Sequence, residues 1–361
     1  MPVPPVLVPW GRLPDGRTAH LITLEHGGLR VRVSDYGGLI VALEAPDRHG
    51  VMADVVLGFD TLEEYLRPGH SPFFGCVIGR VGNRIAGGRC QVAGRDLVLA
   101  TNNHPGGRPC HLHGGERGFD KVLWTPSTRW EATGPVVELR YRSPDGDQGY
   151  PGNLAVTVTY RLQDNGVLQV AYAAETDAPT IVNLTQHSYF NLAGTGTVLQ
   201  HELQVVSECY LPVDPGLIPL GNLAPVAQTP FDFRTLTPIG ARIDAEDPQI
   251  AHGAGYDHTW VLAGAYGTLR PAAILRDPAS GRTMTTWTTE PGVQVYSANY
   301  LPADDQPALI GKAGASYRRR GGVCLETQHF PDTPHHPSFP PIDLRPGEEY
   351  RSCTEFRFSA S

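Results

Sequence analysis

The chain has 361 residues, of which 40% are hydrophobic and 18% are charged. This composition is typical of a globular protein and excludes both an intrinsically disordered chain and a membrane protein. The formal net charge is −8, and the basic residues are scattered along the chain. We therefore expect neither a nucleic acid nor an anionic membrane as a partner, whereas a neutral small molecule fits this charge.

The N-terminal segment and the cysteines bear on where the protein works. Residues 1–10 include four prolines but no basic start and no small-residue cleavage site, so we expect no signal peptide. No apolar run approaches the length of a membrane span. The cysteines, six in number, lie far apart without a C-x-x-C pair, which disfavours a zinc knuckle or a redox motif. An even number permits disulfides, but we expect reduced thiols in a cytoplasmic protein.

Short segments rich in Val, Thr, Tyr and Leu are separated by turn formers, since the chain contains 41 Gly and 33 Pro. In chain order, alternating apolar and polar residues predict strands at 29–33 and 136–141. Between them, residues 61–66 form the best short helical pattern, with Thr61 as the N-cap and Glu64 at the third helical position. Long amphipathic helical patterns are missing, which favours a protein built from strands.

Two hairpins follow in the second half of the chain. Residues 154–162 and 167–175 alternate apolar and polar side chains and are joined by a turn that ends in Asn165-Gly166, a strong hairpin signal. Residues 273–276 and 283–289 flank a cluster of turn formers that contains Asp, Pro, Ser and Gly. Both patterns predict antiparallel pairs of strands.

The last expected strand is 354–358, which alternates in the same way. The chain contains no internal repeat, no low-complexity tract and no Ser/Gly linker that would mark a domain boundary. We therefore predict an all-β fold, a single large antiparallel β-sandwich that includes residues 1–361.

Two segments in the first third of the chain gather polar residues in apolar surroundings. The first, GRVGNRI at 79–85, has a simple interpretation as an exposed loop with two arginines. The second, at 102–115, contains His111 and His113. On a strand these two side chains share a face, so an H-x-H metal site is one alternative.

Two further segments each contain one prominent titratable residue. In VNLTQHSYFNL at 182–192, His187 is either a satisfied core group or a catalyst. In CLETQHFPD at 324–332, Glu326 follows apolar residues. Because burial of a carboxylate without a partner is costly, Glu326 either has donors around it or is tuned for proton transfer.

Taken together, these segments resemble the aldose 1-epimerase (galactose mutarotase) family. The family pattern of G-R…N-R-I, L-H-G-G, N-L-x-x-H-S-Y-F-N-L and E-T-Q…P-D occurs here in order, and YDHT, GVQVY and PFDFR add further matches. The resemblance extends from about residue 10 to 358. Two departures are visible: Ala298 stands where the family usually has Gly, beside the expected sugar site, and Leu220 stands where Thr is common.

The resemblance implies the family's supersandwich fold and the interconversion of α and β anomers of free hexoses, such as glucose and galactose, by ring opening and reclosure. It implies Glu326 as general base, His187 as general acid, and His113 as a hydrogen-bonding assistant. Four further residues match positions that hold sugar hydroxyls: Asn83, Arg84, Asp257 and Gln294. No metal and no cofactor is expected, the partner is a free aldohexose, and the protein is expected to be a monomer or a homodimer. We expect Tyr189 and Trp260 to be core residues.

Three other functions compete with this interpretation. Glu326 and Asp257 are two carboxylates of the kind that glycoside hydrolases use. A sugar-binding module without activity would retain the hydroxyl-binding residues but would not need the acid and the base. A metal site is the third alternative, but His113 and His187 lack a third partner at metal spacing in the sequence.

Overall fold

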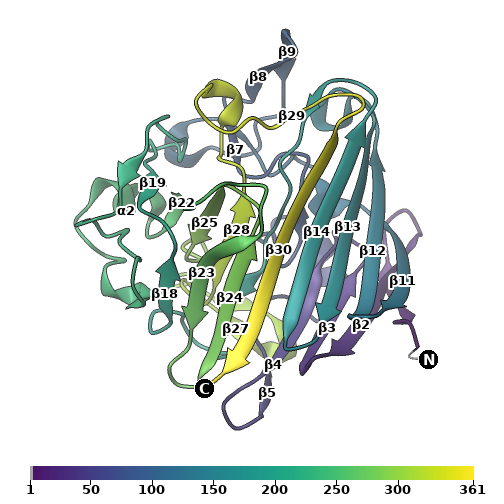
Figure 1. Ribbon diagram of the computed structural model, residues 1–361, viewed down its shortest axis with the longest axis vertical. Coiled ribbons are helices and arrows are strands. Elements are labelled where there is room, and N and C mark those ends of the chain that lie inside the picture. The colour runs from purple at the N-terminus through teal and green to yellow at the C-terminus, as the bar shows by residue number, and fades with distance from the viewer. Residues whose placement is uncertain (1–2) are drawn as a thin grey trace.

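Three antiparallel sheets contain most of the strands in the computed structural model, which describes residues 3–361 (Figure 1). The first sheet has the order β1 (Leu7–Arg12), β2 (Thr18–His26), β3 (Leu29–Ser34), β4 (Ile40–Pro46), β5 (Met52–Asp54). The second has the order β11 (Thr125–Glu131), β12 (Gly134–Ser143), β13 (Leu154–Gln163), β14 (Val167–Thr176), β30 (Glu349–Ala360), β24 (Arg282–Thr288), β23 (Arg270–Arg276), β18 (Glu202–Val205), β21 (Thr237–Pro238). The third has the order β17 (Tyr189–Phe190), β28 (Val323–Gln328), β25 (Gly292–Tyr296), β22 (Asp257–Val261), β19 (Cys209–Leu211), β20 (Ala224–Pro225).

Short pairs of strands, two short α-helices and several single-turn 3-10 helices complete the regular structure of residues 3–361. The pairs are β6 (Val77–Ile78) with β16 (Thr185–Gln186), β7 (Arg84–Ala86) with β10 (Cys110–Leu112), β8 (Arg89–Val92) with β9 (Arg95–Val98), β15 (Thr180–Ile181) with β29 (Asp343–Leu344), and β26 (Leu309–Ile310) with β27 (Ser316–Tyr317). The α-helices are α1 (Leu62–Leu66) and α2 (Pro248–Gly253). In the part of the chain that the structure describes, neither helix reaches the length and apolar character of a membrane span.

The strands and the helix expected from the sequence are confirmed. Gln163 pairs with Val167 across the first hairpin, and Asn165 and Gly166 both have the positive φ that an Asn-Gly turn requires. The second hairpin is formed by β23 and β24. At the start of α1, the Glu64 carboxylate accepts a hydrogen bond from the Thr61 backbone N–H, which is one half of the expected capping box.

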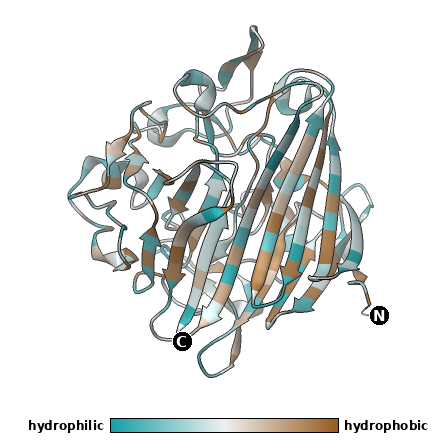
Figure 2. Ribbon diagram, in the orientation of Figure 1, coloured by the Kyte–Doolittle hydropathy of each residue, from teal (hydrophilic) through white to brown (hydrophobic). Residues whose placement is uncertain are grey.

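The three sheets share one hydrophobic core. Its fully buried side chains include Val31 of β3, Tyr160 of β13 and Val295 of β25, one from each sheet. Along β12 to β14 and β30, hydrophilic and hydrophobic residues alternate, so each strand has one face in the core and one toward solvent (Figure 2). This packing confirms the predicted all-β antiparallel sandwich.

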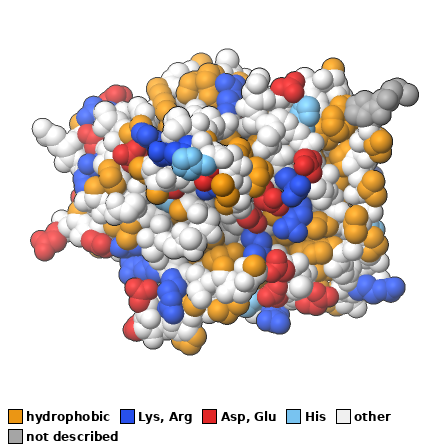
Figure 3. Space-filling model, turned by 90° about the horizontal axis from the view of Figure 1, so that it is seen from below, with side chains coloured by type: hydrophobic (Ala, Val, Ile, Leu, Met, Phe, Trp, Pro, Cys, Tyr) orange, Lys and Arg blue, Asp and Glu red, His pale blue; other side chains and the backbone are white. Residues whose placement is uncertain are grey.

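On the face shown in Figure 3, acidic and basic side chains are interspersed.

Candidate active site

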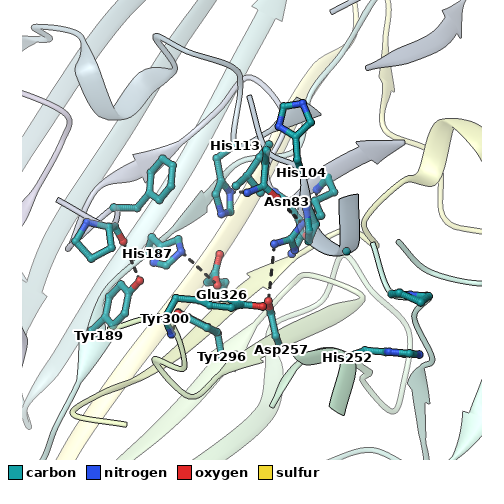
Figure 4. A pocket seen from close by; sticks show the side chains of 18 residues that line it. Asn83, His104, His113, His187, Tyr189, His252, Asp257, Tyr296, Tyr300 and Glu326 are labelled. Atoms are coloured by element: carbon teal, nitrogen blue, oxygen red, sulfur yellow. Dashed lines mark hydrogen bonds and ion pairs between the residues drawn. The ribbon is translucent and has the colours of Figure 1, made fainter. Parts of the chain in front are cut away.

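A cavity of about 490 Å³ lies over the β17, β28, β25 and β22 end of the six-stranded sheet. Six of the seven side chains expected at the site line it: Asn83, Arg84, His113, His187, Asp257 and Glu326. They come from segments up to about 240 residues apart, and the labelled side chains of His113, His187 and Glu326 lie close together in Figure 4. Gln294 is not among the lining residues.

The register of the sheet places the acidic side chains on one face. Thr259 pairs with Gln294, and Gln294 pairs with Glu326, so these three residues form a row across β22, β25 and β28. Asp257 lies two residues before Thr259 on the same strand. Because side chains alternate between the two faces of a strand, Asp257 shares the face of this row. Glu326 and Asp257 therefore face the cavity from the same side of the sheet, with β25 between their strands.

His113 and Asn83 reach the cavity from turns beside the β7 and β10 pair. The His113 backbone N–H donates to the Asn83 carbonyl at 3.0 Å, and the Asn83 backbone N–H donates to His113 Nδ1 at 3.1 Å. Both residues have a positive φ, which is uncommon for residues other than glycine and is found at functional sites. Next to them, Gly114 combines a φ of +82° with a position where a Cβ would lie 1.8 Å from the Gly79 carbonyl oxygen. The L-H-G-G and G-R motifs are therefore parts of one tight contact.

The hydrogen bond to His113 determines which ring nitrogen carries its proton. A backbone N–H can only donate, so His113 Nδ1 is an acceptor and the proton of the neutral ring is on Nε2. Burial, together with His187 and Arg84, holds the pKa of His113 well below its ordinary value, so the ring is neutral near pH 7. His113 thus faces the cavity as a hydrogen-bond donor.

Glu326 and His187 form a buried pair, with exposures of 2% and 4%, and 3.7 Å separates His187 Nε2 from Glu326 Oε1. Burial and the neighbouring Asp257 raise the pKa of Glu326 well above its ordinary value, although Arg84 opposes this shift. Burial also lowers the pKa of His187 to about 4. Glu326 Oε2 has no hydrogen-bond partner among the described residues, which leaves a buried acceptor available in the cavity.

Asp257 is hydrogen-bonded to Gln294, the expected site residue that does not line the cavity. Gln294 Nε2 donates to Asp257 Oδ1 at 2.7 Å, while Thr259 Oγ1 donates to Gln294 Oε1 at 2.5 Å. Arg84 Nη2 lies 3.8 Å from Asp257 Oδ2. Burial raises the pKa of Asp257, and the Arg84 charge and the Gln294 hydrogen bond act in the opposite direction. The structure places Gln294 behind Asp257, so its expected direct contact with sugar stays a prediction.

Aromatic side chains lie around His187, and two of them, Tyr189 and Tyr296, belong to the family motifs. Phe73 and Tyr189 stack on the imidazole with ring centroids 5.7 and 5.2 Å away, Tyr296 packs against both His187 and Tyr189, and Tyr300 also lines the cavity. Tyr189 is buried, as expected, and also lines the cavity, while Trp260 lies in the core only. Phe73 follows a Pro in a segment without a polar pattern, so no signal in the sequence pointed to it.

The hydrogen bonds of His111 and His113 do not fit the alternative of a metal site. His111 is separated from the cavity, because its Nδ1 lies 2.8 Å from the Ala100 carbonyl and its Nε2 lies 2.7 Å from the Tyr150 hydroxyl. Ligand atoms of His113, His187 and Glu326 do lie within 4.8 Å of one another. A metal-bound histidine, however, donates from its second nitrogen, whereas His113 Nδ1 accepts a hydrogen bond from a backbone N–H.

The two departures from the family pattern lie outside the cavity lining. Ala298 is buried with a φ of 51°, so its backbone has the left-handed conformation that glycine adopts without strain. It lies between Tyr296 and Tyr300, which both line the cavity. Leu220 is exposed and does not line the cavity, although Pro215, earlier in the same segment, does.

Comparisons with known proteins show the family of this chain. The sequence profile described as "Aldose 1-epimerase" matches residues 20–357. A galactose mutarotase of Pongo abelii is 46% identical over 98% of this chain and 98% of its own length, and an aldose 1-epimerase of Escherichia coli is 37% identical over 96% and 97%. The crystal structure of a galactose 1-epimerase from Lactobacillus acidophilus has a TM-score of 0.85 at 28% identity and covers 98% of both chains. The chain therefore belongs to the aldose 1-epimerase family.

Proposed function

We propose that this chain interconverts the α and β anomers of free aldohexoses, such as glucose and galactose, with Glu326 as general base and His187 as general acid. The observation that supports these roles is the buried pair at 3.7 Å with an unpartnered carboxylate oxygen in the cavity. A raised pKa for the base brings it toward the working pH, where a general base is most effective.

The proton balance of the reaction fits this pair. Because burial raises the pKa of Glu326 above its ordinary value and lowers that of His187, the carboxyl group holds a proton shared by the pair in preference to the imidazole. Its transfer to His187 Nε2 creates a carboxylate and an imidazolium. The carboxylate then accepts the proton of the sugar O1, the C1–O1 carbonyl forms, the C1–O5 bond breaks, and Nε2 gives its proton to O5. Rotation about C1–C2 and the reverse steps close the ring on the other face.

The remaining polar residues are proposed to hold the sugar in position. His113 donates from Nε2, while Asn83, Arg84 and Asp257 offer an amide, a guanidinium and a carboxylate to hydroxyl groups. A neutral polyol suits a site that has donors, acceptors and aromatic walls together. Gln294 supports the site through its hydrogen bond to Asp257.

The setting of the enzyme is part of the same proposal. We propose that the whole chain acts as one domain, as a monomer or a homodimer, in the cytoplasm. The six free cysteines are compatible with a reducing compartment. Sedimentation of the purified protein would decide between the two oligomeric states.

Polarimetry tests the proposed reaction. With freshly dissolved α-glucose or α-galactose, we expect the purified protein to accelerate the change in optical rotation toward the same equilibrium value that the spontaneous reaction reaches. Initial rates over a range of concentrations of each sugar would rank the two substrates. Release of reducing sugar from a glycoside without accelerated mutarotation would instead support a hydrolase, and sugar binding without either would indicate a binding module.

A further inference from the structure

One strand contacts both nitrogens of the proposed acid. Cys324 and Glu326 lie two residues apart on β28 and therefore on the same face of the strand. Cys324 Sγ lies 3.6 Å from His187 Nδ1, and Glu326 Oε1 lies 3.7 Å from His187 Nε2. The imidazole is thus held between a thiol and a carboxyl group of one strand.

The two histidines of the cavity have opposite partners at Nδ1. His113 Nδ1 faces a backbone N–H, which fixes its proton on Nε2. His187 Nδ1 faces a thiol, which is able to accept as well as to donate a hydrogen bond. Only His187 can therefore keep a proton on Nδ1 and leave Nε2 free to gain and lose one.

From this contrast we propose that Cys324 is a positioning residue: its sulfur accepts the Nδ1–H of His187 throughout the reaction, so that Nε2 exchanges the proton with Glu326 and the sugar. The proposal rests on the proposed roles of Glu326 and His187. In the cycle, Nε2 receives the carboxyl proton of Glu326 and passes it to O5, while the Nδ1–H···S contact is unchanged. No other bond forms or breaks at the sulfur.

The surroundings of the ring suit this arrangement. Sulfur is a weak acceptor and stabilises an imidazolium less than a carboxylate at Nδ1 would, so the charged ring remains a strong acid. Phe73 and Tyr189 stack on the ring and give it an apolar aromatic environment. Burial holds Cys324 as the thiol, because it raises the pKa of this group well above its ordinary value.

The position of the proton is measurable without turnover. In protein labelled with [¹⁵N]histidine, the signals of His187 are assigned by their loss in the His187→Asn variant. At pH 7 we expect the long-range ¹H–¹⁵N correlation spectrum of the free enzyme to show a protonated Nδ1 and an unprotonated Nε2. A proton on Nε2 of the neutral ring would overturn the proposal, whatever the activity of the enzyme.

Two substitutions test the consequence for catalysis. Cys324→Ala removes the acceptor, and we expect kcat to fall on the order of tenfold, as for the loss of one hydrogen bond. Cys324→Ser retains an acceptor, so we expect kcat within about threefold of the wild type, because one group that can accept replaces another. Since a hydroxyl oxygen accepts more strongly than sulfur, the acid limb of the kcat profile should move to higher pH.

The control is Cys76→Ala, which removes a buried thiol from the same apolar cluster. The Cys76 thiol donates to the Phe73 carbonyl, whereas the sulfur at His187 Nδ1 is that of Cys324, so the spectrum of His187 and the acid limb should be those of the wild type. The titratable and charged groups around His187 remain in place in all three variants: Glu326, His113, Tyr189 and Tyr296.

Each outcome bears on the proposal separately from the activity itself. Wild-type kcat and an unchanged acid limb in Cys324→Ala would overturn it. If Cys324→Ala does not fold, the proposal is tested by the spectrum of His187 in the wild type and by the acid limb of the kcat profile in Cys324→Ser. A proton on Nε2 or an unshifted limb would then overturn it. If the wild type lacked mutarotation but showed the expected spectrum, the assigned roles would fail while the position of the proton would stand.

Discussion

Two carboxylates share the face of one sheet in the cavity, and their contacts differ. Asp257 has hydrogen-bonding or ionic partners on both oxygens, Gln294 on one side and Arg84 on the other. Glu326 has one oxygen near His187 and one without any partner in the described part of the chain. A carboxylate whose oxygens are occupied is suited to hold a hydroxyl group, whereas one with a free oxygen beside an imidazole is suited to move a proton.

This difference predicts distinct kinetic effects for Glu326→Gln and Asp257→Asn, which both remove a charge and preserve shape. An amide at 326 cannot accept the O1 proton, so kcat should fall by about 10²–10⁴-fold while KM changes much less. An amide at 257 still accepts one hydrogen bond, so Asp257→Asn should lose less activity, and the loss should appear mainly as a higher KM. Polarimetry over a series of sugar concentrations separates the two patterns. Retained kcat in Glu326→Gln together with total loss in Asp257→Asn would show that the roles are assigned wrongly.

The pH dependence of kcat/KM follows from the single proton on the buried pair. With the pKa of His187 lowered to about 4, a second proton binds only near that pH, so activity should stay level through pH 6.5, where an ordinary histidine titrates. The alkaline limb should lie well above the ordinary pKa of a glutamate, because the raised pKa of Glu326 governs loss of the last proton. Rates corrected for spontaneous mutarotation between pH 4 and 9 test this, and an acid limb centred at pH 6.5 would contradict it.

At the scale of elements, the site depends on turns that only glycine permits. The backbone at Gly114 has a positive φ and lies against Gly79, which holds the His113 turn over the six-stranded sheet. Gly146 has nearly the same φ, +80°, but no atom lies within 4 Å of its Cβ position. Substitutions at Gly114 and at Gly146 can therefore be compared to separate the cost of the backbone conformation from the cost of a steric clash.

We therefore expect Gly114→Ala to lower the free energy of unfolding by about 3 kcal/mol or more, because strain and overlap with the Gly79 carbonyl add. Gly146→Ala, the matched control, has only the conformational term and should lose about 1–2 kcal/mol. Urea unfolding followed by fluorescence measures both. Equal losses in the two variants would mean that the contact with Gly79 relaxes without cost.

At the scale of the whole molecule, several histidines are buried in the neutral form. Burial lowers the pKa of His187 and of His201 to about 4 and that of His258 to about 3. Each binds a proton more readily in the unfolded chain, where its pKa is near 6.5. The folded state is therefore favoured above pH 6.5, and this stability is lost as the pH falls from 6.5 toward 4.

The expected result is that these histidines lower the free energy of unfolding by several kcal/mol at pH 4.5 relative to pH 7.5, a loss that the raised pKa values of Glu326 and Asp257 partly offset. Urea titrations at both pH values measure it. His201→Asn removes one of these groups outside the cavity and should flatten the dependence, even if it lowers stability at pH 7.5. A dependence equally steep in this variant would show that His201 is not a major contributor.

The proposed chemistry also predicts how the enzyme responds to removal of metals. Since the tautomer of His113 opposes a metal at the cavity, prolonged treatment with a chelator should leave the rate of mutarotation unchanged. Activity before and after dialysis against the chelator, with zinc added back, is the measurement. Lost activity that zinc restores would bring back the metal interpretation.

The sequence by itself determined the elements that local chemistry controls. The hairpin of β13 and β14 follows from alternating side chains and an Asn-Gly turn, and α1 follows from Thr61 and Glu64, because these signals act over a few residues. The family motifs also identified six residues that line the cavity. Motif positions, however, do not show which side chains line the cavity and which ones only support them.

Only the tertiary structure decided the contacts between distant segments. It placed Gln294 behind Asp257, His111 against Tyr150, and Phe73 against His187. It also gave His113 and His187 different partners at Nδ1, a backbone N–H for one and a thiol for the other. These contacts depend on strand register and on turns that join segments far apart in the chain, and burial there sets the pKa values, so no local pattern records them.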